Sequence, residues 1–331
     1  MTLHDDVYLE LSSVATVRLV ASLRDSRLNF GSPDDVRIFL PDMHIVSNRT
    51  RAKYSYGTND MDLLADVLVR LAGLKARSQG RTVGIFQVGD FLDLWREEPV
   101  ASARVDAASR IVMDHPRLMN AIFSPTLKAR FLLGNHDIDL AWWPNFAAWE
   151  RRYYLPPRGS SQASGVVVHG DMFDWVELTP DPINQFFVYF FSPLFGAADH
   201  DLNDVKTVVN RQNSAASFTN QIGGTAQLGD VFGSPGVPDR HNLGTHSFLN
   251  KARDTARAAN RAYQLNLRFM VIGHTHHARI ALHDGGGDDF FALIDCGGWL
   301  EDATDANGVH YKNQTLAVLS ENDVRIYLLS H

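Results

Sequence analysis

The chain has 331 residues, of which 45% are hydrophobic and 21% are charged, an ordinary balance for a globular protein with a sizeable core. It carries 31 lysines and arginines against 38 aspartates and glutamates, and the resulting net charge of −7 argues against a general nucleic-acid binder. The length fits one large α/β domain with an insertion, and we treat residues 1–331 as a single domain.

The cysteine content and the apolar runs bear on the compartment. A single cysteine, Cys296, excludes an internal disulfide and a cysteine-rich zinc site. The acidic residues 1–6 are followed by no apolar run of the kind that signal peptides contain. The most apolar stretch, residues 186–195, is far shorter than the roughly 20 residues that a membrane-spanning helix needs. We therefore expect a cytoplasmic protein without a transmembrane segment.

The first half of the chain alternates strands with helices. Apolar runs predict strands at residues 36–40, 83–88, 129–133 and 166–168. Apolar residues at helical spacing predict a helix over residues 61–75, and residues 101–123 read as mostly helical with a break near Pro116. Such alternation is typical of a layered α/β sheet, in which ligands bind outside the carboxyl ends of the strands.

The second half begins with a long interruption. Residues 171–246 are rich in glycine and proline, and we interpret them as an insertion, a partly helical cap beside the site. Its aromatic run at residues 186–191 could form an apolar wall for an acyl chain, make a peripheral membrane contact, or only pack the insertion onto the main domain. A helix is predicted over 247–263, then strands over 269–272, 290–294, 315–319 and 324–329.

Metal-ligand chemistry follows five of the predicted strands. Carboxylate, imidazole and amide groups of this kind suit divalent cations, and paired ions are suited to the hydrolysis of phosphate esters. Any one histidine is more often a buried imidazole with hydrogen-bond partners, and Gly-Asp alone is a common turn. Five such segments in order predict that distant residues converge on a two-metal site. The segments are Asp42-Met43-His44, Gly89-Asp90, Gly134-Asn135-His136-Asp137, His169-Gly170-Asp171 and Gly273-His274-Thr275-His276.

This order of motifs, D-x-H, G-D, G-N-H-D, H and G-H-x-H, resembles that of the calcineurin-like metallophosphoesterases. The resemblance covers residues 36–299 apart from the insertion. It implies a four-layer α/β/β/α sandwich that holds two divalent metal ions, with manganese expected ahead of iron or zinc. It also implies hydrolysis of a phosphodiester, pyrophosphate or phosphomonoester bond by a hydroxide between the metals.

The resemblance assigns a role to each motif residue. His136 would stabilise the transition state or protonate the leaving oxygen, and Asp137 would either orient His136 or cap a helix. Asp90 would bridge the two ions. The first metal would be bound by Asp42, His44 and His276, and the second by Asn135, His169 and His274.

A narrower resemblance concerns the substrate. Residues 89–95, 169–171 and 296–299 are similar to the UDP-2,3-diacylglucosamine pyrophosphatase branch, although that branch typically has arginine where this chain has His136. We expect a small phosphorylated substrate, with a nucleotide-linked lipid as an alternative. A non-catalytic metal-binding scaffold is the alternative from another class, and a nuclease is disfavoured because the chain shows no basic stripe.

Overall fold

The structure is a computed structural model that describes residues 2–54, 59–78, 80–98, 103–142, 149–156, 162–171, 248–276, 278–286, 289–304 and 310–331. The predicted insertion at 171–246 lies outside the described residues, apart from Asp171. Its proposed helical content and its aromatic run therefore stay predictions.

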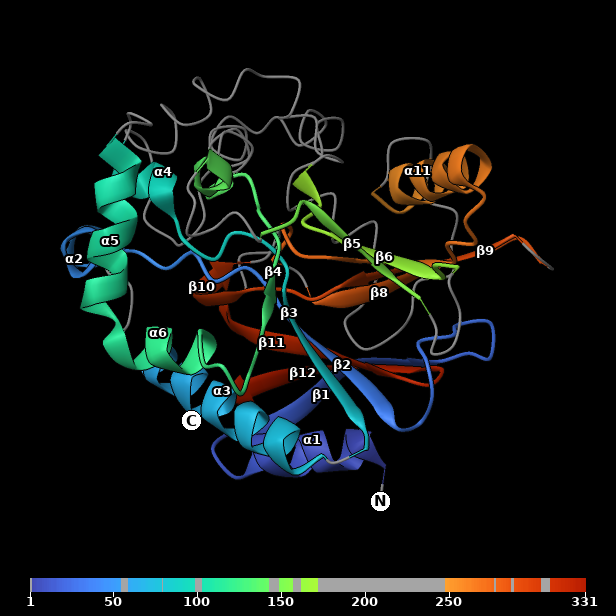
Figure 1. The fold of residues 1–331 in the computed structure, drawn as a ribbon, viewed down its shortest axis with the longest axis horizontal. Coiled ribbons are helices and arrows are strands. Elements are labelled where there is room, and N and C mark those ends of the chain that lie inside the picture. Colours follow the sequence, from blue (N-terminus) through green and yellow to red (C-terminus); the bar gives the residue numbers. More distant parts are fainter. Residues whose placement is uncertain are drawn as a thin grey trace.

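The described chain is a mixed α/β structure built around two mixed sheets (Figure 1). The order of the first seven elements is α1 (Leu3–Ser12), β1 (Thr16–Arg24), β2 (Asp35–Leu40), α2 (Asn48–Tyr54), α3 (Asn59–Arg77), β3 (Thr82–Gln87) and α4 (Leu94–Glu97). There follow α5 (Arg104–Asp114), α6 (Pro116–Ile122), β4 (Arg130–Phe131), the 3-10 helix η2 (Ile138–Trp142), β5 (Arg152–Leu155) and β6 (Gly165–Val168). The last elements are α11 (Phe248–Tyr263), β7 (Phe269–Ile272), β8 (Arg279–Asp284), β9 (Phe290–Asp295), β10 (Trp299–Thr304), β11 (His310–Ser320) and β12 (Asp323–Ser330).

The strands that precede the motifs run parallel within each sheet. The first sheet has the order β1-β12-β11-β2-β3-β4, with β10 paired to β11, and β2, β3 and β4 are mutually parallel. The second sheet has the order β5-β6-β7-β9-β8, and β6, β7 and β9 are parallel. The carboxyl ends of parallel strands lie at one edge of a sheet, so both sheets present their motif loops at such an edge.

Three hydrophobic clusters hold these layers together. One cluster joins α1, α3 and α6 to the outer face of the first sheet, and it includes Leu3, Leu68 and Ile85. A second lies between the sheets, where Phe39 of β2 and Val271 of β7 are both buried. The third joins α11 to the second sheet. The helices therefore lie outside and the two sheets face each other, as the view in Figure 1 shows.

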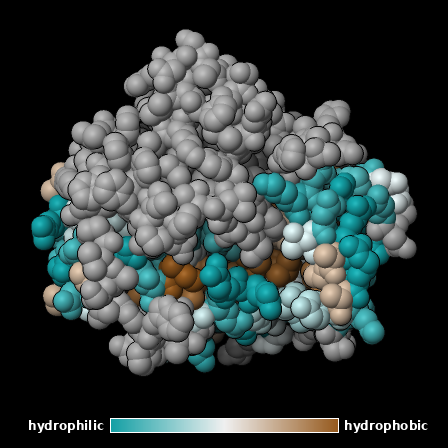
Figure 2. All heavy atoms as spheres, turned by 90° about the horizontal axis from the view of Figure 1, so that it is seen from above, coloured by the Kyte–Doolittle hydropathy of each residue, from teal (hydrophilic) through white to brown (hydrophobic). Residues whose placement is uncertain are grey.

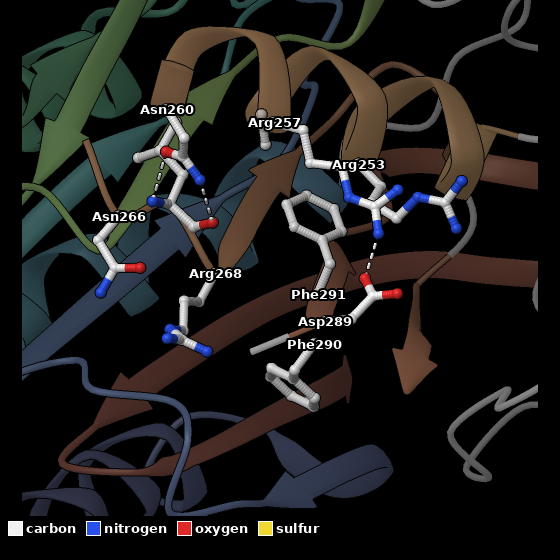
Figure 3. A pocket seen from close by; sticks show the side chains of 10 residues that line it. Arg253, Arg257, Asn260, Asn266, Arg268, Asp289, Phe290 and Phe291 are labelled. Atoms are coloured by element: carbon white, nitrogen blue, oxygen red, sulfur yellow. Dashed lines mark hydrogen bonds and ion pairs between the residues drawn. The ribbon is translucent and has the colours of Figure 1, made fainter. Parts of the chain in front are cut away.

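Helix α11 is also fixed to the second sheet by polar contacts (Figure 3). The amide of Asn260 donates to the carbonyl of Leu267 and accepts from its N–H, at 3.1 and 2.7 Å. Arg257 pairs with Asp289 at the start of β9. These contacts surround a cavity of about 60 Å³. Because the polar groups of Asn260 and Arg257 already have partners, we regard the cavity as part of the helix's attachment.

The helices and one face of the described part of the chain bear on contact with a membrane. None of its helices has the length and apolar character needed to cross a membrane. On the face seen in Figure 2, the described side chains are mostly hydrophilic, with small hydrophobic areas between them.

Candidate metal centre

All seven predicted metal ligands follow strand ends, at the edge where the carboxyl ends of the parallel strands lie. Asp42 and His44 follow β2, Asp90 follows β3, and Asn135 follows β4, while His169 follows β6 and the pair His274 and His276 follows β7. Six of the seven, all but Asn135, fall with His136 into three overlapping groups whose ligand atoms lie within 4.8 Å of one another. These groups could hold a metal ion.

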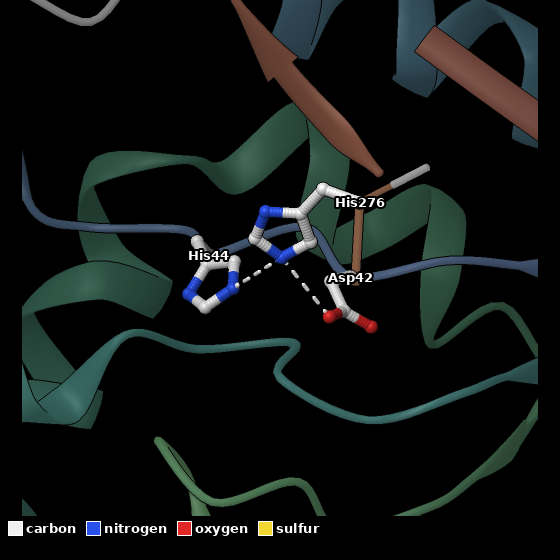
Figure 4. A group of neighbouring side chains, drawn as sticks. All are labelled: Asp42, His44 and His276. Carbon is white, nitrogen blue, oxygen red and sulfur yellow. Dashed lines mark hydrogen bonds and ion pairs between the residues drawn. The ribbon is translucent and has the colours of Figure 1, made fainter. Parts of the chain in front are cut away.

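The first group consists of Asp42, His44 and His276 (Figure 4). Nε2 of His276 lies 3.1 Å from Oδ2 of Asp42 and 3.2 Å from Nε2 of His44. All three side chains are buried. Residues from both sheets therefore meet here, although 232 positions separate His44 from His276.

The second group consists of Asp90, His169 and His274. Nε2 of His169 lies 3.2 Å from Oδ2 of Asp90 and 3.0 Å from the amide oxygen Oδ1 of Asn135. The rings of His169 and His274 are 5.0 Å apart. The predicted amide ligand, Asn135, is thus placed beside the second group.

Hydrogen bonds on the far side of two imidazoles fix which nitrogen faces the centre. Nδ1 of His169 lies 3.1 Å from the carbonyl oxygen of Val88, and Nδ1 of His44 lies 3.2 Å from Asp93. These oxygens accept, so each Nδ1 carries a proton and Nε2 is the ring nitrogen that faces the centre. The Nε2 atoms then lie close to a carboxylate of the centre, with Nε2 of His169 at 3.2 Å from Oδ2 of Asp90.

A cation would balance the charge of the carboxylates at this centre, and one carboxylate oxygen in particular lacks a hydrogen-bond donor. Oδ1 of Asp42 is buried and accepts no hydrogen bond from the residues that the structure describes. Burial opposes a charge on His169, yet the charges of Asp90 and Asp42 raise its pKa well above the ordinary value. The field of the site therefore favours positive charge, and the donor set fits a divalent metal ion.

The backbone at this edge is bent into a conformation that non-glycine residues rarely adopt. His44, Asp90, His274 and His276 have φ values of 45°, 46°, 67° and 56°. Positive φ costs energy for residues with a side chain and is concentrated at functional sites. Four of the seven predicted ligands share this feature.

The glycines of the motifs leave room for ligand side chains. A Cβ on Gly134 would lie 2.0 Å from Oδ1 of Asp90, and a Cβ on Gly273 would lie 2.1 Å from Oδ1 of Asp42. Gly89 is close to the ring of His169 in the same way, at 2.4 Å from Nδ1. At the positions before Asp90, Asn135 and His274, any residue larger than glycine would therefore collide with a ligand that follows another strand.

His136 is held by Asp93 and not by Asp137. Nδ1 of His136 lies 2.9 Å from Oδ1 of Asp93. The two oxygens of Asp137 instead accept the N–H groups of Gly134 and Phe91, at 2.7 and 2.8 Å. Asp137 thus fixes the turn that carries Asn135 and His136, and its pKa is raised to about 7 by burial and by the charge of Asp90. The contact that would orient His136 is thus seen with Asp93, and the role expected for Asp137 stays a prediction.

From the sequence alone, Asp93 could support the metal shell or simply cap a turn, and in the structure it contacts two histidines and is the N-cap of α4. Asp93 is fully buried and contacts His44 and His136 through separate oxygens, and Arg96 lies 2.8 Å from one of them. Burial opposes its ionisation, but the charges of Arg96 and His136 hold its pKa well below the usual range. An ionised carboxylate therefore supports two histidines of the centre.

Comparison with known proteins adds no assignment, since no protein-family model matches the sequence and no curated protein matches it.

Proposed function

We propose that this protein is a metal-dependent phosphoesterase of the calcineurin-like type, with two divalent metal ions at the candidate centre. One observation carries the proposal. The single oxygen Oδ2 of Asp90 lies 3.6 Å from Nε2 of His44 and 3.2 Å from Nε2 of His169. Asp90 thus stands between the two histidine groups, where a carboxylate that bridges two ions is needed.

The arrangement of layers supports the same proposal. A helix layer, two facing sheets and a helix on the outer face follow from the three hydrophobic clusters, which agrees with a four-layer α/β/β/α sandwich. We propose manganese ahead of iron or zinc, because aspartate, asparagine and histidine ligands admit all three metals and the oxygens of Asp42, Asp90 and Asn135 suit manganese.

Each motif residue would have a part in metal binding or in the reaction. Asp42, His44 and His276 would hold one ion, Asn135, His169 and His274 the other, and Asp90 both. When bound, the ions would activate water for attack on phosphorus and neutralise phosphoryl charge. His136, whose Nδ1 faces Asp93, forms a candidate metal-binding group with His44 and Asp90. There it would donate a proton to the leaving oxygen, or a hydrogen bond to the phosphoryl group. The substrate we propose is a small phosphorylated molecule in the cytoplasm.

The test measures hydrolysis of bis-p-nitrophenyl phosphate and p-nitrophenyl phosphate by protein stripped with EDTA, before and after manganese is added. We expect metal to restore turnover. In Asp90→Asn we expect turnover to fall by at least about a hundredfold, together with metal content. Asp62→Asn, which removes a charge from an exposed ion pair with Arg117, is the matched control and should keep both. Turnover that is independent of metal, or an Asp90→Asn variant as active as the control, would refute the proposal.

A further inference from the structure

Helix α4 places a tryptophan against the ring of His136. Trp95 is 2% exposed, and its ring stacks on the imidazole with centroids 4.7 Å apart and planes 25° from parallel. The ring of His44 meets His136 edge-on from another side, at 4.7 Å and 90°. With Nδ1 facing Asp93, the imidazole has contacts that restrict rotation about both of its side-chain bonds.

The same turn of chain supplies two of these contacts. Asp93 is the N-cap of α4, and its Oδ1 accepts the backbone N–H of Arg96 at 3.2 Å. Trp95 is the second residue of that helix. The cap therefore fixes the indole and the carboxylate relative to each other, and both relative to His136.

The buried position of the indole is unfavourable for its N–H group. Its Nε1–H is buried and has no hydrogen-bond partner among the residues that the structure describes. A buried donor without an acceptor is destabilising, and a buried tryptophan normally finds one. The hydrogen-bonding group of the indole therefore does not explain a tryptophan at position 95. The stacking of its ring face on His136 does.

We propose that Trp95 is a positioning residue that holds the imidazole plane of His136 for its part in the reaction. This inference rests on the proposed phosphoesterase function. A ring that turns freely loses the alignment of its nitrogen with the leaving oxygen, and such alignment contributes much of the rate at a proton-transfer step. The stack joins Trp95 to His136 and includes none of the seven predicted metal ligands, so we expect metal binding to depend little on it.

The kinetic test compares Trp95→Phe, which keeps a stacking ring and removes the unpaired N–H, with Trp95→Leu, which removes the ring. Substrates are bis-p-nitrophenyl phosphate and diphenyl phosphate, whose phenolate is the poorer leaving group. In Trp95→Leu we expect kcat to fall by about tenfold or more, and further for diphenyl phosphate, with KM and metal content within about twofold. Trp95→Phe should stay near the unsubstituted protein.

Phe30→Leu serves as the control for the loss of a buried aromatic ring, because Phe30 is 1% exposed and packs on Phe269, between the sheets. It should change stability without changing the ratio of the two substrates. Where Trp95→Leu does not fold, Trp95→Met replaces it. Unchanged kcat in the ring-free variant, an equal loss in Trp95→Phe, or loss of metal together with activity would each overturn the proposal.

A second readout needs no activity. In protein with isotope-labelled histidine, the stacked indole should shift the ring protons of His136 upfield. We expect that shift to persist in part in Trp95→Phe and to vanish in Trp95→Leu. If the protein hydrolyses no phosphate ester, the proposed function fails, while the NMR shift still decides whether Trp95 holds the ring. An unshifted His136 in the unsubstituted protein would overturn the positioning role.

Discussion

At the scale of single residues, Asp93 contacts two histidines of the centre and one buried arginine. Its two oxygens face His44 and His136, and Arg96 balances its charge from a site that is itself fully buried. Removing one member of a buried ion pair leaves the other uncompensated, which is more costly than the pair is stabilising. Asp93 therefore affects both stability and chemistry.

We predict that Asp93→Asn lowers both the free energy of unfolding and the turnover. The neutral amide removes the charge that Asp93 places beside the buried Arg96, so the free energy of unfolding should fall by about 3 kcal/mol, as measured by urea denaturation. Turnover with metal should fall about 10–100-fold, because one of the two oxygens that orient His44 and His136 becomes an NH2 group, which cannot accept. Asp62→Asn again provides the control. Equal stability and turnover in the two variants would mean that the Asp93 contacts do not support the centre.

The positions of the ligands, but not all of their partners, could be predicted from the sequence. Asp42, His44, Asp90, His169, His274 and His276 follow strands, and parallel strands must bring such residues to one edge. The contacts of Asp137 with two backbone amides could not be predicted. They depend on which N–H groups point inward at the turn after β4, and that is set by the folded chain.

At the scale of elements, each motif is a strand end followed by a turn with little free space. The turn after β7 shows this most clearly. Gly273 is in contact with Asp42 from β2, and the N–H of His274 donates to Oδ2 of the same aspartate at 2.6 Å. A loop of the second sheet thus holds in place a ligand that follows a strand of the first sheet. The position of the Asp42 carboxylate therefore depends on how closely the two loops fit.

We therefore expect Gly273→Ala to weaken metal binding by about tenfold or more, because the added methyl group displaces the Asp42 carboxylate. Overpacking should also lower the free energy of unfolding by about 1–3 kcal/mol. Gly80→Ala is a useful comparison. Its φ of +76° is strained for alanine, but its Cβ meets nothing within 4 Å. Calorimetric titration with manganese separates the two effects. Equal affinity in both variants would contradict the role given to Gly273.

Elements with continuous apolar runs or a clear helical period were predicted well. Strands β2, β3, β7 and β12 and helices α3 and α11 lie where the sequence predicts them, and the predicted break at Pro116 separates α5 from α6. No prediction was made for α1, β1, β5 or β8. In β1 most residues are exposed or half-buried, so its apolar pattern is weak, and its pairing with β12 depends on residues some 300 positions away. Such non-local pairing leaves no local signal.

At the scale of the whole molecule, the layers are joined by buried polar contacts as well as by apolar packing. His4 of α1 is 3% exposed, and its Nε2–H donates to the carbonyl of Val318 in β11 at 3.1 Å. His115, between α5 and α6, makes a similar contact with the carbonyl of Val46 at 2.7 Å. In both contacts the carbonyl oxygen accepts, so Nε2 of each histidine carries a proton.

The pKa values of His4 and His115 are both lowered from the ordinary 6.5. Burial is the main cause in both, followed for His4 by the charge of Arg325. The unfolded chain then binds protons that the folded chain does not, so unfolding is favoured as the pH falls. The stability associated with neutral His4 and His115 is fully present above pH 6.5 and is lost as the pH falls through their folded values.

We predict that the free energy of unfolding falls between pH 7 and pH 5, and that His4→Gln makes this fall shallower. Glutamine keeps an N–H for Val318 but does not titrate, so the slope should decrease by up to about 1.4 kcal/mol per pH unit. Urea denaturation of both proteins at half-unit steps measures the difference. From pH 7 upward the two stability curves should run parallel, which serves as the internal control. Parallel curves down to pH 5 would mean that the attachment of α1 to the first sheet does not depend on the charge of His4.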